Sequence, residues 1–161
     1  MNTDEPALPD YPYWDDTWIA RDALGRIGAF VTAGHGPIPV STLEAVSIPI
    51  SEIGKRVLEM PVRGEAVMQV EYPRPDHFLA LGQRGLFVFD WSDVLRVRAA
   101  ELGAYERVCL PGSPLFESDL SPELRQYLAY RPRFQVKFES VATFDPRQQT
   151  TCIEAKWNEV K

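Results

Sequence analysis

Two histidines and two cysteines are the residues of this chain best suited to acid–base or nucleophilic chemistry. His35 stands between Gly34 and Gly36, and the absence of flanking side chains would let its imidazole approach a ligand closely. Paired in space with Cys109 or with an aspartate, His35 could serve as the base of a small enzyme. Cys109 occupies an apolar position of a strand-like stretch, however, which favours burial as a small hydrophobic side chain. An exposed loop position is the simpler interpretation of His35.

The sequence predicts neither a metal site nor a cofactor site. His35 and His77 have no second ligand at a recognised spacing, and the two cysteines, 109 and 152, form no CxxC motif. The AGHGP stretch carries glycines but lacks the Lys and Ser or Thr of a phosphate-binding loop. A nucleophile elbow and an HExxH motif are also missing. We therefore expect no catalytic residue, metal or cofactor.

Asp90 and Asp93 form the other candidate for chemistry, an acid and base pair in the sequence DWSD. Carboxylates at the end of a strand more often cap the turn that follows. Capping is the favoured interpretation, and the turn stays a candidate for contact with a partner.

An aromatic and acidic segment near the start is typical of a recognition surface. Its sequence YPYWDDTW places large rings beside carboxylates, the combination found in protein interfaces. The alternative is that the rings pack on a sheet while the acids face solvent. Together with the loops above, the predicted partner-binding residues are Tyr11, Tyr13, Trp14, Asp15, Asp16, His35, Asp90 and Asp93.

Hairpins are the elements expected to position these residues. Residues 18–32 contain two apolar stretches around Gly25, which predicts two strands joined by a turn. Residues 77–91 have two apolar runs on either side of residues 82–85, which predicts a second hairpin.

Further strands are expected over residues 105–110, 133–140 and 151–157, where side chains alternate at a period of two. In the second of these, one face would be buried and would carry Phe134, Val136 and Phe138.

Two helices have recognisable starts. Ser121 is a predicted N-cap followed by Pro122 at the first helical position, with a buried stripe of Leu124, Tyr127 and Leu128. Ser51 is expected to cap a second, shorter helix, and Ser41 another turn before it. The prediction is a single α+β domain over residues 1–161, with a mainly antiparallel sheet built from hairpins and two or three short helices. Residues 1–12 are predicted to form an extended, acidic, proline-rich arm.

Charge and composition limit the possible partners. The net charge is −6, and residues 1–20 carry five carboxylates without any Lys or Arg. Negative potential opposes binding to nucleic-acid phosphates and attracts a basic protein. The sequence has no run of about 20 apolar residues, so no membrane-spanning helix is predicted. The acidic start does not resemble a secretory signal. Two cysteines are few for an exported domain, so we expect a cytoplasmic protein. From the charge and the lack of an apolar run, we expect neither a nucleic-acid nor a membrane partner.

Three stretches resemble a known group of proteins: WIARDALGRIGAFVTAGHGPIP, LALGQRGLFVFDW and YERVCLPGSPLFESDLSPEL, within residues 18–124. They are similar to bacterial cytoplasmic immunity proteins encoded beside polymorphic or type VI secretion toxins. The resemblance implies a protein without chemistry of its own that binds one cognate toxin and blocks it, and it transfers no functional residues.

The leading hypothesis is therefore an immunity protein that occludes the active site of a cytoplasmic-acting toxin. An acidic inhibitor suits a basic toxin such as a nuclease. Two alternatives stay open: a small α+β enzyme that uses His35 with Cys109 or an aspartate, and a general adaptor or ligand-binding module.

Overall fold

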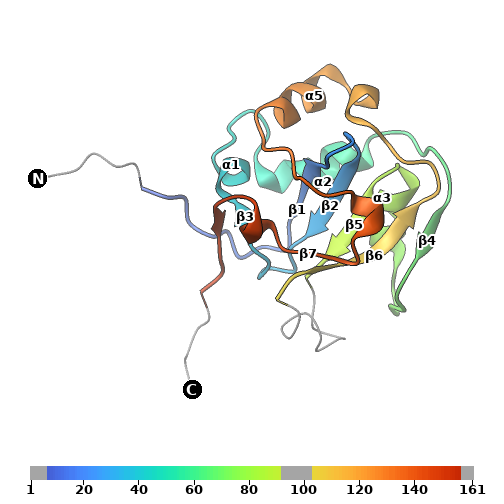
Figure 1. Ribbon diagram of the computed structural model, residues 1–161, viewed down its shortest axis with the longest axis horizontal. Helices are drawn as coiled ribbons and strands as arrows, with labels where there is room; N and C mark the ends of the chain where they lie inside the picture. Colours follow the sequence, from blue (N-terminus) through green and yellow to red (C-terminus); the bar gives the residue numbers. More distant parts are fainter. Residues whose placement is uncertain (1–6, 92–102, 157–161) are drawn as a thin grey trace, which may run out of the picture.

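A six-stranded sheet lies at the centre of the computed structural model, which describes residues 7–91 and 103–156 (Figure 1). Its main strands are, in spatial order, β1 (Thr17–Arg21), β2 (Ile27–Val31), β5 (Phe87–Asp90), β6 (Tyr105–Pro111) and β4 (Ala66–Met68). A short strand pairs with β6, and a separate two-stranded sheet joins two others; these are β7 (Thr143–Phe144), β3 (Ile38–Pro39) and β8 (Cys152–Ile153). Among the strands described, only β2 and β5 pair in parallel. The predicted α+β class with a mainly antiparallel sheet is confirmed.

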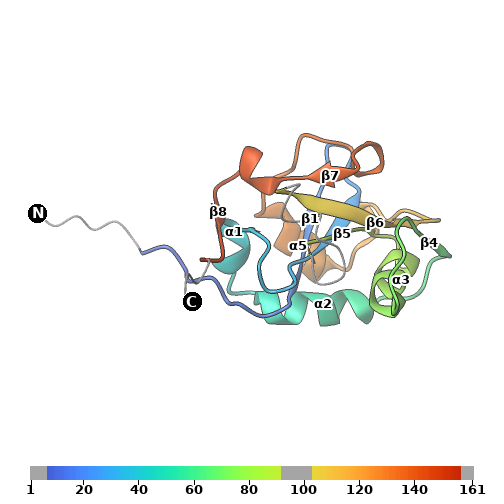
Figure 2. The same cartoon turned by 90° about the horizontal axis from the view of Figure 1, so that it is seen from below.

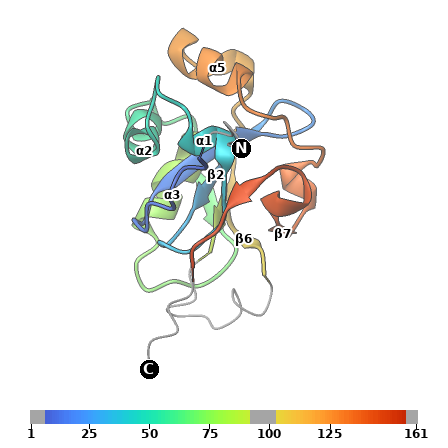
Figure 3. The same ribbon diagram turned by 90° about the vertical axis from the view of Figure 1, so that its left-hand side faces the viewer.

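Helices cover one face of the sheet. Figures 2 and 3 show α2 and α3 on one side and the C-terminal segment with β7 on the other. The α-helices in the described part of the chain are α1 (Val40–Leu43), α2 (Ile50–Leu58), α3 (Asp76–Gln83) and α5 (Pro122–Ala129). Single 3₁₀ turns occur at Glu117–Asp119, Phe138–Ser140 and Pro146–Gln148. None of the helices described is long and apolar enough to cross a membrane.

The first predicted hairpin is confirmed as β1 and β2. Its turn contains Gly25 at a φ of 84°, in the left-handed region that glycine enters without steric cost. The buried Asp22 organises the turn, because one of its carboxylate oxygens accepts the backbone N–H groups of Leu24 and Arg26, both at 2.9 Å. The pairing places Thr17 opposite Val31.

The second predicted hairpin is wrong in its first half. Residues 76–83 form the helix α3, and only the second run forms a strand, β5. A short apolar run such as Phe78 to Leu81 fits a buried helix turn as well as a strand, so its period does not decide between them. β5 pairs instead with β2 and with β6.

The predicted strand over residues 133–140 is also wrong, although its pattern of burial is right. Phe134 and Phe138 are buried and Val136 is half-buried, while Gln135 and Lys137 are exposed. The segment makes isolated hydrogen bonds to the β1–β2 hairpin instead of a ladder, for example from the Phe134 N–H to the Arg21 carbonyl at 3.0 Å. The last predicted strand shortens to β8.

The helix predicted to start after Ser121 is confirmed as α5, and the Ser121 hydroxyl accepts the N–H of Leu124 at 3.4 Å. The helix α2 is present where expected, but its N-cap is Pro49, so Ser51 lies inside the first turn.

The sheet separates two hydrophobic cores of different composition. The core beneath α2, α3 and α5 is largely aliphatic, with Ile27, Ile53 and Leu128 among its buried residues. The opposite core is largely aromatic: the ring centroids of Trp18 and Phe30 stack 4.2 Å apart. Stacked and edge-on ring pairs add to the stabilisation that comes from burial alone.

Two helical glycines provide a matched test of this packing. A Cβ at Gly82 in α3 would lie 2.7 Å from the Cβ of Ala66 and 2.8 Å from the Sγ of Cys109. We expect Gly82→Ala to lower the free energy of unfolding by about 1–3 kcal/mol through overpacking. At Gly54 in α2 the nearest atom is the Thr17 Cβ, at an ordinary 3.5 Å. Gly54→Ala should therefore be neutral or stabilising by up to about 1 kcal/mol, because alanine favours helix.

Denaturant titration of both variants measures the difference. Equal free energies of unfolding for the two variants would contradict the close contact of α3 with β4 and β6.

Candidate functional site

The aromatic and acidic segment and the His35 loop, which lie apart in the sequence, are joined in the structure. The buried Thr32 connects them: its hydroxyl donates to the Trp14 carbonyl at 3.1 Å and accepts the N–H of Asp16 at 3.1 Å. The same oxygen accepts the Gly34 N–H at 3.2 Å, and the Thr32 N–H donates to the Asp16 carbonyl at 2.9 Å. Residues 13–16 and 32–36 therefore form one surface, called here the Trp14 surface.

Asp15 adds a second link within the Trp14 surface. Its Oδ1 accepts the N–H of Ala33 at 2.9 Å. Ala33 has a φ of 54° and Tyr13 a φ of 59°, a left-handed conformation that costs energy for residues other than glycine. The hydrogen bonds between the two turns help to offset that cost.

Two tyrosine hydroxyls donate hydrogen bonds to the backbone of the His35 loop. Tyr11 donates to the Gly36 carbonyl at 2.7 Å, and Tyr105 donates to the Pro37 carbonyl at 2.9 Å. Tyr105 also accepts the indole N–H of Trp18 at 3.1 Å. Burial raises the pKa of both hydroxyls, so they stay protonated donors at neutral pH. A Cβ at Gly36 would lie 2.4 Å from the Tyr105 oxygen, so the close approach requires glycine.

Exposure divides the predicted aromatic residues into two groups. Trp14 is 73% exposed and Tyr13 51% exposed, whereas Tyr11 is buried and Trp18 lies wholly within the aromatic core. Both interpretations of the segment therefore apply, each to different residues. His35 is exposed, and its backbone N–H donates to the Thr32 carbonyl at 3.0 Å.

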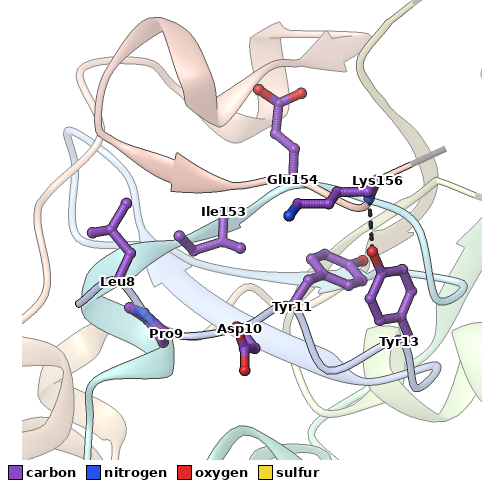
Figure 4. Close-up of a pocket in the computed structure, with 8 residues that line it drawn as sticks. All are labelled: Leu8, Pro9, Asp10, Tyr11, Tyr13, Ile153, Glu154 and Lys156. Atoms are coloured by element: carbon purple, nitrogen blue, oxygen red, sulfur yellow. Dashed lines mark hydrogen bonds between the residues drawn. The ribbon is translucent and has the colours of Figure 1, made fainter.

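A groove runs beside the Trp14 surface, with a volume of about 570 Å³ (Figure 4). One wall comes from the N-terminal segment, and the other comes from the end of β8 and the chain that follows it. The lining residues are Leu8, Pro9, Asp10, Tyr11, Tyr13, Ile153, Glu154 and Lys156. The Tyr13 hydroxyl accepts the backbone N–H of Lys156 at 2.8 Å, which connects the two walls. Sequence reasoning missed the second wall, because no local signal marks a contact between residues 143 positions apart.

Asp16 is an electrostatically unfavourable member of the Trp14 surface. Its Oδ2 is buried and accepts no hydrogen bond from the residues that the structure describes. Burial, with a smaller contribution from the neighbouring charge of Asp15, raises the pKa of the Asp16 carboxyl.

The two aspartates of the DWSD turn do not extend this surface. Asp90 is almost fully buried at the end of β5, and Tyr72 donates its hydroxyl proton to the Asp90 Oδ2. The predicted contact of Asp90 with a partner is therefore corrected, because the side chain points into the protein. Asp93 lies outside the described residues.

The structure does not bring Cys109 and His35 together. Cys109 is fully buried beneath α3, beside Gly82, and burial raises the pKa of its thiol to about 11. The exposed imidazole of His35 lies in a loop beyond the end of β2. Within residues 7–91 and 103–156, no group of three or more His, Cys, Asp or Glu side chains could hold a metal ion.

The chain matches no protein-family model, no curated protein and no solved structure. The candidate site is therefore defined by the geometry of the Trp14 surface and the adjoining groove.

The raised pKa of Asp16 predicts a pH-dependent gain from Asp16→Asn. The native state binds the Asp16 proton more tightly than the unfolded state, so ionisation of this carboxyl opposes folding as the pH rises above its ordinary value of 3.8. Asp16→Asn should raise the free energy of unfolding at pH 7. The gain should vanish at a pH below 3.8, where the wild-type carboxyl is protonated in both the native and the unfolded state.

Urea titrations at the two pH values test this expectation. Asp10→Asn is the matched control, because it removes the same charge from an exposed position. A loss of stability in Asp16→Asn at pH 7 would mean that the Asp16 charge has a stabilising partner.

Proposed function

We propose that this protein is an immunity-type inhibitor, which binds one cognate toxin in the cytoplasm and neutralises it by covering the toxin's active site. The observation that carries the proposal is the Trp14 surface: two chain segments fixed to each other by hydrogen bonds, with Trp14 and Asp15 exposed on one segment and His35 exposed on the other. The resemblance of residues 18–124 to immunity proteins agrees with it.

Rigidity favours a binding role for this surface. Association loses free energy when loops and side chains must be ordered, and a surface that is already ordered avoids much of that cost. Thr32, Tyr11 and Tyr105 hold the backbone of the Trp14 surface before any partner arrives. Exposed tryptophan and tyrosine are the residues that most often dominate binding energy in interfaces.

Charge favours a basic toxin. Asp10, Asp15 and Asp16 lie in the same N-terminal segment, and the whole chain has a net charge of −6. Such a surface attracts a basic protein and accelerates its association, as an inhibitor of a nuclease requires. Its preferred partner is then the toxin, and not the nucleic acid that the toxin would bind.

The groove of Figure 4 favours one second candidate, a small-ligand or adaptor module. Its volume of about 570 Å³ suits a small molecule, and apolar and polar groups both line it, for example Ile153 and Lys156. The enzyme alternative with Cys109 gains no support, since a thiol with a pKa of about 11 is a poor nucleophile at neutral pH.

Binding kinetics with the partner test the proposal. Co-purification from the native host, followed by mass spectrometry, identifies the toxin, and an inactive variant of that toxin is then used for surface plasmon resonance. Trp14→Ala should raise the dissociation rate by about 30-fold, equivalent to about 2 kcal/mol. Asp10→Asn should mainly lower the association rate and weaken its dependence on salt.

Tyr130→Ala is the control, because it removes an equally exposed aromatic side chain at the end of α5. If Trp14→Ala and Tyr130→Ala have the same kinetics, or if no toxin is recovered, the Trp14 surface is not the inhibitory interface.

A further inference from the structure

Among residues 7–91 and 103–156, no strand pairs with the outer edge of β4, so β4 lies at a free edge of the main sheet as the structure describes it. It pairs with β6 on one side and is the last strand in the spatial order. Figure 1 shows it at the right-hand margin of the molecule, with none of the described elements beyond it. Residues 65–69 contain no Pro, Lys or Arg, although these residues commonly protect exposed strand edges from pairing.

The backbone groups at this edge can be assigned from the hydrogen bonds on the other side. The Glu65 carbonyl accepts the Gly112 N–H at 2.8 Å, and the Gln69 N–H donates to the Val108 carbonyl at 2.8 Å. Because alternate residues of a strand direct their N–H and C=O groups to the same side, Glu65, Val67 and Gln69 face β6. The N–H and C=O groups of Ala66 and Met68 therefore face outward.

Side chains in this segment alternate between the core and the solvent. Glu65, Val67 and Gln69 are exposed, and Val67 is 62% exposed, whereas Ala66 and Met68 are half-buried against the aliphatic core. An exposed valine at the centre of a free edge is a good site for pairing with another strand.

The edge is complementary to itself. In an antiparallel pair centred on Val67, the outward groups of Ala66 meet those of Met68 in the other copy, which gives four N–H···O bonds. The two Val67 side chains then face each other across a pair without hydrogen bonds, the closer of the two spacings.

Charge supports the same register. Glu65 of each copy lies opposite Gln69 of the other, so no like charges meet. The Gln69 side-chain carbonyl accepts the Arg107 Nε–H at 2.7 Å, which leaves the Gln69 amide N–H groups to face Glu65. The Arg107 guanidinium next to that amide adds attraction for the Glu65 carboxylate, and two-fold symmetry repeats the contact.

We propose that β4 pairs with β4 of a second copy of this chain, antiparallel and about a two-fold axis at Val67, to form a continuous sheet across a homodimer. The inference is independent of the proposed toxin. The paired segment is short, so the dimer is concentration-dependent.

Sedimentation velocity over a wide range of protein concentration tests the dimer. The wild type should pass from monomer to dimer. Val67→Lys places two like charges at the axis and should raise the dissociation constant at least about tenfold. Val46→Lys is the matched control, since Val46 is 94% exposed and lies away from β4 in the turn after α1; this variant should dimerise as the wild type does.

A charge exchange tests the register. Glu65→Lys should weaken the dimer, because the introduced ammonium group meets Arg107 of the other copy. Adding Gln69→Glu should restore the dimer, because each introduced lysine then faces a carboxylate.

Amide hydrogen exchange gives a direct readout of the paired edge: the Ala66 and Met68 amides should be protected only at concentrations where the dimer forms.

Circular dichroism confirms that each variant is folded. A wild type that stays monomeric at every concentration would overturn the proposal, as would a folded Val67→Lys variant with an unchanged dissociation constant. Protection of Ala66 and Met68 that requires a different protein would likewise show that the edge serves another partner.

Discussion

The hydrogen bonds accepted by the Asp22 carboxylate are the interaction on which the β1–β2 hairpin and the aromatic face of the sheet depend. The carboxylate is fully buried, and its oxygens accept three backbone N–H groups, from Leu24, Arg26 and Phe138. The first two close the turn of the β1–β2 hairpin. The third attaches a segment more than a hundred residues later, which carries Phe134 and Phe138 into the aromatic core. That segment has no strand ladder of its own, so a buried acceptor at the hairpin replaces the ladder. Gly28 completes the arrangement, because a Cβ there would lie 2.8 Å from the Phe138 ring.

Strand direction then determines where the Trp14 surface forms. Thr17 begins β1 opposite Val31 at the end of β2, and Val31 in turn lies opposite Asp90 at the end of β5. The segment before β1 and the loop after β2 therefore meet at one end of the sheet, although 18 residues separate Trp14 from Thr32. Once the hairpin register is set, the Thr32 hydroxyl is placed to satisfy both segments. The aromatic core supplies the remaining supports through Trp18 and Tyr105.

The elements that depend on local signals are predictable from the sequence, whereas the parts of the fold and of the candidate site that depend on long-range contacts are not. The β1–β2 turn and α5 were recognised because Gly25 and Ser121 act on residues next to them. The apolar run of residues 77–81 predicts a strand but lies in the helix α3, because a run this short has no clear period. The aromatic and acidic segment was identified by composition, but composition could not show that Tyr11 and Trp18 face inward while Trp14 faces outward. Nothing near Lys156 in the sequence indicates its contact with Tyr13.

The spatial order of the strands separates the two proposed interfaces. The Trp14 surface adjoins the start of β1, at one edge of the sheet, and β4 lies at the other edge beyond β6. A pairing of β4 with its copy would therefore leave the Trp14 surface uncovered on each subunit. Two inhibitory surfaces in one assembly would raise the effective affinity for a toxin that is itself dimeric, and would bind two separate copies of a monomeric toxin without that gain. Dimerisation and inhibition are thus compatible in this fold because the strand order places them at opposite edges.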